Sequence, residues 1–212
     1  MLTCNNLTCM RGDRRIFDSL GFTIGTGTVL VLRGSNGSGK TTLMKMLAGL
    51  IKPTAGDISW YKLDIHSDLT AYHRDILMIG HKNAIKPELT VADNIRLWSK
   101  LRHTEEIFDA ALHYFQLTDK RDIPCYMLSE GWQRRVALAR TIACHAELWL
   151  LDEPMANLDG EGKRLMVNII NTRTQQGGIV VLSSHEPLPL TNACELYLED
   201  FKSSNILEES DA

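Results

Sequence analysis

Short, continuous apolar runs recur along the chain, at residues 29–34, 76–81, 147–153 and 177–185. Runs of this kind are typical of strands that are buried on both faces of a parallel sheet. Elsewhere apolar residues recur at helical spacing, which predicts helices over 40–50, 130–144 and 160–175. The first of these helices is predicted to carry Met44, Leu47 and Leu50 on one face. Strands that alternate with helices predict an α/β fold with a parallel-sheet core.

The amino-terminal part of the chain follows another pattern. Residues 1–10 and 16–24 are predicted to form two antiparallel strands joined by a turn at 11–15, and residues 56–60 a further strand. These segments predict a small antiparallel β subdomain beside the parallel sheet.

The middle of the chain, from about residue 87 to 143, is rich in helical patterns and interrupts the α/β alternation. Helices are predicted over 90–103 and 104–117, the second with Thr104 as its N-cap. Its apolar stripe consists of Ile107, Phe108, Ala111, Leu112 and Phe115. We therefore expect one domain over 1–212 that contains a helical subdomain, followed only by a frayed acidic tail at 203–212.

Composition narrows the classes of protein that remain. The chain has 212 residues, of which 44% are hydrophobic and 23% charged, with a net charge of −3. There is no basic surplus of the kind that nucleic-acid binders carry, so no nucleic-acid partner is expected. No apolar run approaches the roughly 18 residues of a membrane span, and the first ten residues are too polar for a secretory signal.

The turn after the first apolar run carries the first chemical motif. Residues 34–41 read Gly-Ser-Asn-Gly-Ser-Gly-Lys-Thr, the spacing of a loop whose backbone N–H groups surround phosphates at the start of a helix. Lys40 is predicted to reach the β- and γ-phosphates, and Thr41 to supply a hydroxyl to Mg²⁺. The predicted nucleotide-binding residues here are Gly34, Ser35, Asn36, Gly37, Ser38, Gly39, Lys40, Thr41 and Thr42. The alternative is a glycine-rich turn that binds nothing.

A second motif, Leu-Trp-Leu-Leu-Asp-Glu-Pro, occupies residues 148–154. Asp152, at the end of an apolar strand, is predicted to hold Mg²⁺ together with Thr41. Glu153 is predicted to polarise the attacking water as general base. The alternative is an exposed turn after a core strand.

The third motif, Leu-Ser-Glu-Gly-Trp-Gln-Arg-Arg-Val-Ala-Leu-Ala-Arg at 128–140, decides the class. It resembles the signature of ATP-binding-cassette (ABC) ATPases, in which Ser129 and Gly131 serve the γ-phosphate of an ATP held by the opposite subunit. The sequence Ala-Asn-Leu-Asp at 156–159 resembles the family's dimer-crossing loop, and His185 its switch histidine. The resemblance implies a P-loop NTPase fold of the ABC type, with ATP and Mg²⁺ as ligands and a head-to-tail homodimer that sandwiches ATP.

Four positions depart from the family's pattern. Arg11 stands where an aromatic residue usually stacks on adenine, and a guanidinium plane can stack on a base in its place. The signature has Glu130 for its first glycine and Trp132 for its glutamine. Lys82 stands where a glutamine usually follows the second apolar run, and lysine cannot accept a hydrogen bond.

The combined motifs, with Gly-His-Lys-Asn-Ala-Ile-Lys at 80–86, most resemble the ATP-binding subunits of cytochrome c maturation (haem exporter) transporters. That resemblance implies a transporter ATPase bound through an integral membrane permease to the cytoplasmic face of the inner membrane. Two alternatives remain: the ATPase subunit of another small-substrate, lipid or drug efflux transporter, and a soluble regulatory ATPase of the ABC type.

Overall fold

A computed structural model describes residues 1–202, so the predicted acidic tail lies outside the described part of the chain. Its central feature is a parallel sheet of order β6-β7-β8-β3-β9. The strands are β3 (Val29–Arg33), β6 (Ile76–Ile79), β7 (Leu148–Leu151), β8 (Ile179–Ser183) and β9 (Ala193–Tyr197). Four of the five coincide with the apolar runs of the sequence, which confirms the predicted parallel core.

A second sheet, antiparallel and of order β2-β1-β4-β5, lies beside the first. It consists of β1 (Leu2–Arg11), β2 (Arg14–Ile24), β4 (Ala55–Trp60) and β5 (Leu63–Asp64). The pair β1 and β2 turns at Gly12, whose φ is 59°, and Arg11 pairs with Arg14 at the end of the hairpin. The predicted antiparallel subdomain is therefore present.

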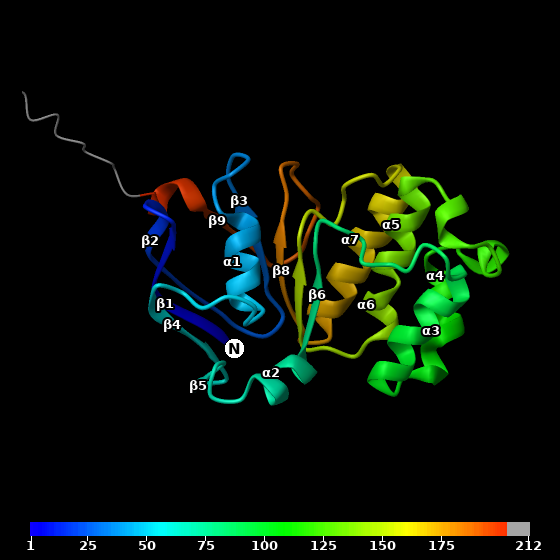
Figure 1. The fold of residues 1–212 in the computed structure, drawn as a ribbon, viewed down its shortest axis with the longest axis horizontal. Helices are drawn as coiled ribbons and strands as arrows, with labels where there is room; N and C mark the ends of the chain where they lie inside the picture. Colours follow the sequence, from blue (N-terminus) through cyan, green and yellow to red (C-terminus); the bar gives the residue numbers. More distant parts are fainter. Residues whose placement is uncertain (203–212) are drawn as a thin grey trace, which may run out of the picture.

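The helices cover the parallel sheet on its two faces. They are α1 (Lys40–Leu47), α2 (Leu69–Asp75), α3 (Val91–Arg102), α4 (Phe108–Tyr114), α5 (Glu130–Leu138), α6 (Arg140–Ala143) and α7 (Gly160–Gln175), with 3₁₀ turns at Glu105–Ile107, Thr118–Lys120, Cys125–Met127 and Leu198–Phe201 (η4). Helix α1 lies between the two sheets, whereas α3 to α7 gather on the opposite side (Figure 1). None of the helices in residues 1–202 is long and apolar enough to cross a membrane.

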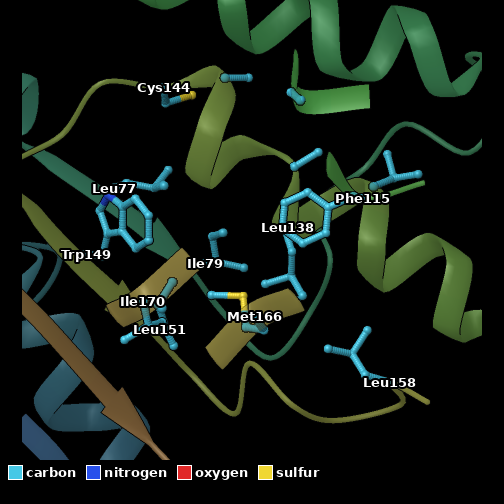
Figure 2. Packing of buried hydrophobic residues seen from close by; sticks show 14 of the residues in the cluster. Leu77, Ile79, Phe115, Leu138, Cys144, Trp149, Leu151, Leu158, Met166 and Ile170 are labelled. Carbon is cyan, nitrogen blue, oxygen red and sulfur yellow. The ribbon is translucent and has the colours of Figure 1, made fainter. Parts of the chain in front are cut away.

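Alternate residues of each parallel strand feed two separate cores. Val29 and Val31 of β3 belong to the core under the helical side, whereas Leu30 and Leu32 pack with α1 and the antiparallel sheet. Figure 2 shows the first core, where side chains of β6 and β7 meet those of α5 and α7. Because the sheet is covered on both faces, its strands read as continuous apolar runs.

One predicted feature of the helices is wrong, and a second is confirmed only in its position. Leu50 does not join the apolar face of α1: the helix ends at Leu47, Gly49 takes a φ of 69°, and Leu50 is 60% exposed. Glycine after a helix end stops it in this way because the left-handed conformation turns the chain aside. Thr104 stands at the N-cap position, before the 3₁₀ turn at Glu105–Ile107, but its side chain makes no capping hydrogen bond. Its buried hydroxyl donates instead to Ala143 O of α6 at 2.6 Å.

The remaining differences concern boundaries and short elements. The helix predicted over 130–144 is divided into α5 and α6 at Ala139, where the Arg140 and Thr141 side chains donate to the carbonyls of Ala137 and Leu138. The sequence pattern missed α2, β5 and β9. Strand β9 is an edge strand with only Leu196 buried, and it therefore lacks a continuous apolar run.

Candidate active site

The predicted phosphate loop joins β3 to α1, and its glycines adopt positive φ angles. These are 142° at Gly34, 79° at Gly37 and 108° at Gly39, a region that glycine enters without steric cost. Packing also requires glycine at position 39, because a Cβ there would lie 2.6 Å from Ile16 Cγ2 of β2. The glycines of the motif thus have a conformational reason at the positions where they stand.

Lys40 is buried, and its ammonium folds back over the loop. Nζ donates to Gly34 O at 2.6 Å and to Ser35 O at 3.0 Å. An ammonium has three donors, so one is left over. Within the described chain, Ser38 is 1% exposed and its Oγ has no hydrogen-bond partner. A spare ammonium donor and a buried, unpartnered hydroxyl in one loop fit a phosphate group.

Thr41 and Asp152, the predicted Mg²⁺ residues, are in direct contact. Thr41 Oγ1 donates to Asp152 Oδ2 at 2.7 Å, and Ser183 Oγ donates to Asp152 Oδ1 at 2.8 Å. Asp152 and Ser183 stand at the carboxyl ends of neighbouring strands β7 and β8, which explains why they meet. A hydroxyl and a buried carboxylate suit Mg²⁺, which takes few protein ligands and completes its shell with water and phosphate oxygens.

Glu153 follows Asp152 with an unusual backbone. Its φ is 49°, a left-handed conformation that costs a non-glycine residue about 1–2 kcal/mol, and its N–H donates to Ser183 Oγ at 2.8 Å. The carboxylate lies between two imidazoles, with Oε1 3.3 Å from His185 Nε2 and Oε2 3.9 Å from His81 Nδ1. The structure thus brings together Glu153 and His185, the two predicted catalytic residues. The sequence did not predict that His81, which precedes the exposed Lys82, would lie beside Glu153.

A pocket of about 300 Å³ collects predicted residues from distant parts of the chain. It is lined by Arg11, Ile16, Asn36, Gly37, Gly39, Lys40, Thr41, Thr42, Lys45 and Glu153. Glu153 also lines a smaller adjoining pocket together with His185. Ser129 and Gly131 line neither pocket, and their helix α5 lies on the other side of the parallel sheet from α1 (Figure 1).

The predicted signature forms the start of helix α5. Ser129 is its N-cap, with Oγ accepting from Trp132 N at 3.5 Å. A Cβ at Gly131 would lie 2.7 Å from Asn157 O, so glycine is required there for close approach to the 156–159 loop. The Trp132 ring contacts two cations, the Lys120 ammonium 4.4 Å and the Arg135 guanidinium 4.6 Å from its centroid. Such stacking accounts for an aromatic residue at this position.

Arg134, on the same helix, supports the site but was not singled out in the sequence. It is 2% exposed, and its guanidinium donates to the carbonyls of Gly80, Asp152 and Glu153 and to Asn83 Oδ1. Burial lowers the pKa of Arg134, whereas the charges of Asp152 and Glu153 oppose that shift. The signal that could have revealed it is a buried position on an apolar helix face occupied by arginine. Arg134 ties the ends of β6 and β7 to the signature helix.

Comparison with known families agrees with this geometry. A family model described as "ABC transporter" matches residues 17–156, which include the phosphate loop, the α5 helix and the strand that ends at Asp152. The match spans well over half of the chain. The chain therefore belongs to the ABC transporter family, as an ATP-binding member.

A curated relative narrows this assignment. The chain is 40% identical over 207 residues, 98% of this chain and 99% of the relative, to the cytochrome c biogenesis ATP-binding export protein CcmA of Wolbachia pipientis wMel. This similarity confirms the resemblance predicted from the sequence motifs.

Solved structures share the fold. A putative ABC transporter ATP-binding protein from Pyrococcus furiosus superposes with a TM-score of 0.82 at 28% identity, covering 95% of this chain and 99% of that one. The dimeric, post-hydrolysis structure of the ATP-binding cassette MJ0796 with ADP and Pi superposes with a TM-score of 0.77 at 23% identity, covering 88% of each chain. Both place the chain in the ABC ATPase fold.

Proposed function

We propose that this chain is the ATP-hydrolysing subunit of a membrane export complex that acts in c-type cytochrome biogenesis. The observation that carries the proposal is the 40% identity across nearly the whole length of a cytochrome c biogenesis ATP-binding export protein. The residues for ATP binding and hydrolysis come together in one pocket, which is lined by the phosphate loop and Glu153. In this proposal the chain works as one nucleotide-binding domain, with residues 87–143 as its helical subdomain.

ATP binding is assigned to the phosphate loop and its neighbours. The loop N–H groups and the spare donor of Lys40 hold phosphate oxygens, aided by the positive end of α1. Arg11 lines the same pocket, and its guanidinium plane stacks on adenine in place of an aromatic ring. Thr41 and Asp152 hold Mg²⁺, which when bound neutralises phosphate charge as the leaving group departs.

Hydrolysis is assigned to Glu153 with His185. The Glu153 carboxylate orients a water and accepts its proton, and Glu153 lines both pockets. His185 Nε2, 3.3 Å from that carboxylate, fixes the position of the carboxylate and faces the terminal phosphate.

A second copy of the chain is assigned the rest of the site. Helix α5, which has Ser129 as its N-cap and Gly131 in its first turn, lies on the other side of the parallel sheet from α1, the helix that follows the phosphate loop (Figure 1). In this proposal α5 therefore serves the nucleotide of another subunit. A dimer is the state of the solved cassette MJ0796, which shares this fold. An integral membrane permease is the further partner, and it holds the two subunits at the cytoplasmic face of the inner membrane.

The proposal is tested in the source organism by replacing the gene with the Lys40→Ala variant. Export in cytochrome c biogenesis predicts that covalently bound haem in c-type cytochromes is lost, as measured by haem staining of denatured proteins. The wild-type gene restores the signal. Normal c-type cytochromes in the variant strain would contradict the proposal and favour another efflux transporter, or a regulatory ATPase.

A further inference from the structure

The carboxyl-terminal strand of the described chain lies directly beside the strand that carries the phosphate loop. β9 pairs in parallel with β3, and Tyr197 stands opposite Arg33 at the end of the ladder. Both segments continue in the same direction beyond their strands. The second residue after β9 is Glu199 in η4, the second residue after β3 is Ser35 in the loop, and these two residues are in contact. The topology of the sheet therefore delivers an acidic side chain to the phosphate loop.

The contact between them is close and involves the loop backbone. Glu199 Oε1 accepts from Ser35 N at 2.6 Å and from Ser35 Oγ at 2.9 Å. The hydrogen bond from the Ser35 backbone lowers the pKa of Glu199, which keeps the side chain a carboxylate. A Cβ at Gly34 would lie 2.8 Å from Glu199 Oε2, so glycine there also leaves room for the acid.

One peptide group links this carboxylate to the phosphate-binding lysine. The N–H of Ser35 donates to Glu199, and the C=O of the same peptide, that of Gly34, accepts from Lys40 Nζ at 2.6 Å. Hydrogen bonds that are connected in series through one peptide group polarise and strengthen one another. Gly34 has a φ of 142°, where glycine gives the peptide rotational freedom, so an external group is needed to fix its direction.

We propose that Glu199 is a positioning residue for nucleotide binding, which fixes the Gly34–Ser35 peptide so that its carbonyl holds Lys40 over the loop. This inference rests on the proposed role of the loop and of Lys40 in ATP binding. With Glu199 in place, Lys40 is held by two carbonyls and turns its third donor to a phosphate. Without it, the peptide can rotate, and Lys40 loses one of the two acceptors that orient it.

Charge alone predicts the opposite effect of Glu199 on ATP binding, because a carboxylate beside the loop repels phosphates. The geometry favours positioning, since Oε1 is already engaged by two donors of Ser35 and its charge is partly compensated. The two effects differ in sign. Positioning predicts weaker ATP binding when the acceptor is removed, whereas repulsion predicts tighter binding when the charge is removed.

The test compares Glu199→Ala, Glu199→Gln and a control, Asp200→Ala, in the exposed neighbouring position of η4. The measurements are equilibrium binding of a non-hydrolysable ATP analogue, kcat and KM for ATP in the full chain, and thermal unfolding. Glu199→Ala is expected to raise Kd and KM about three- to tenfold, the effect of one net hydrogen bond, with kcat unchanged. Glu199→Gln keeps an acceptor oxygen and is expected to stay within about twofold of wild type, as is Asp200→Ala.

Other outcomes overturn the inference. Unchanged or tighter binding in Glu199→Ala would exclude positioning, and equal weakening in Glu199→Gln would assign the effect to charge. A parallel fall in thermal stability and kcat would reduce Glu199 to a structural role, which Leu198, fully buried in the same turn, is expected to prevent. Lys40→Ala is measured alongside: if it leaves ATP binding intact, the proposed role of the loop itself fails, independently of Glu199.

Discussion

At the scale of single residues, backbone conformation and close approach explain site positions that chemistry alone does not. Gly131 was predicted as a phosphate contact, yet the structure gives it a second reason, because a Cβ would lie 2.7 Å from Asn157 O. That oxygen belongs to the backbone of the 156–159 loop and cannot move aside as a flexible side chain can. The two reasons for glycine can be separated by measuring stability without nucleotide.

We predict that Gly131→Ala destabilises the nucleotide-free protein. Alanine ordinarily stabilises a helix relative to glycine, but here the methyl group overpacks the contact with Asn157, which costs about 1–3 kcal/mol. The free energy of unfolding, from urea titration, is expected to fall by this amount. Gly160→Ala is the matched control, since it stands in the first turn of α7 with nothing within 4 Å of a Cβ. Equal stability of the two variants would show that the Asn157 contact imposes no constraint.

At the scale of elements, the sequence patterns predicted the strands that are buried on both faces. They missed the exposed elements at the edge of the parallel sheet. Strands β3, β6, β7 and β8 were predicted because both of their faces are covered. β9 and η4 expose most of their residues, so no apolar period marked them, and the contact of Glu199 with the loop could not be predicted. Thr104 was predicted at the right N-cap position, but the sequence could not show that its hydroxyl is held by the carbonyl of Ala143 in a distant helix.

Arg134 shows how one element can support several others, and its loss has a predicted cost. Arg134→Met keeps the length of the side chain but leaves the carbonyls of Gly80 and Asp152 without this donor. The carbonyl of Glu153 also loses it and keeps only the N–H of Ala156, at 3.1 Å. Removing the charge also removes its own desolvation cost, but the unpartnered acceptors stay buried. We expect the free energy of unfolding to fall by about 2–4 kcal/mol, measured by urea titration with the exposed Arg164→Met as control. A change no larger than that of the control would contradict the bracing role.

At the scale of the whole molecule, the motifs divide into two groups on opposite sides of the parallel sheet. Arg11, Lys40, Thr41 and Glu153 line one pocket, whereas Ser129 stands at the start of α5 beyond the sheet. Local motif chemistry predicted each group, but only the fold shows that one chain cannot close both around the same nucleotide without large rearrangement. This separation is the physical basis for assigning the second group to a partner copy.

The variant Glu153→Gln tests both the chemistry and the assembly. Glutamine keeps the size and hydrogen bonding of the side chain but removes the basic oxygen, so hydrolysis is expected to fall by about 10²–10⁴-fold. ATP affinity is expected to stay near wild type, because the phosphate loop and Lys40 are untouched. With hydrolysis blocked, two ATP molecules should hold two chains together between the phosphate loop of one and Ser129 of the other.

Size-exclusion chromatography of Glu153→Gln with and without ATP is the measurement. A dimer that forms only with ATP is expected, and the added change Ser129→Arg should abolish it, because a bulky cation at the N-cap replaces the hydroxyl and opposes the positive end of α5. Lys40→Ala is the control that prevents dimers by preventing ATP binding. Normal hydrolysis in Glu153→Gln would exclude its role as base. A hydrolysis-deficient variant that binds ATP and stays monomeric would separate the two assignments, retaining the base and rejecting the shared site.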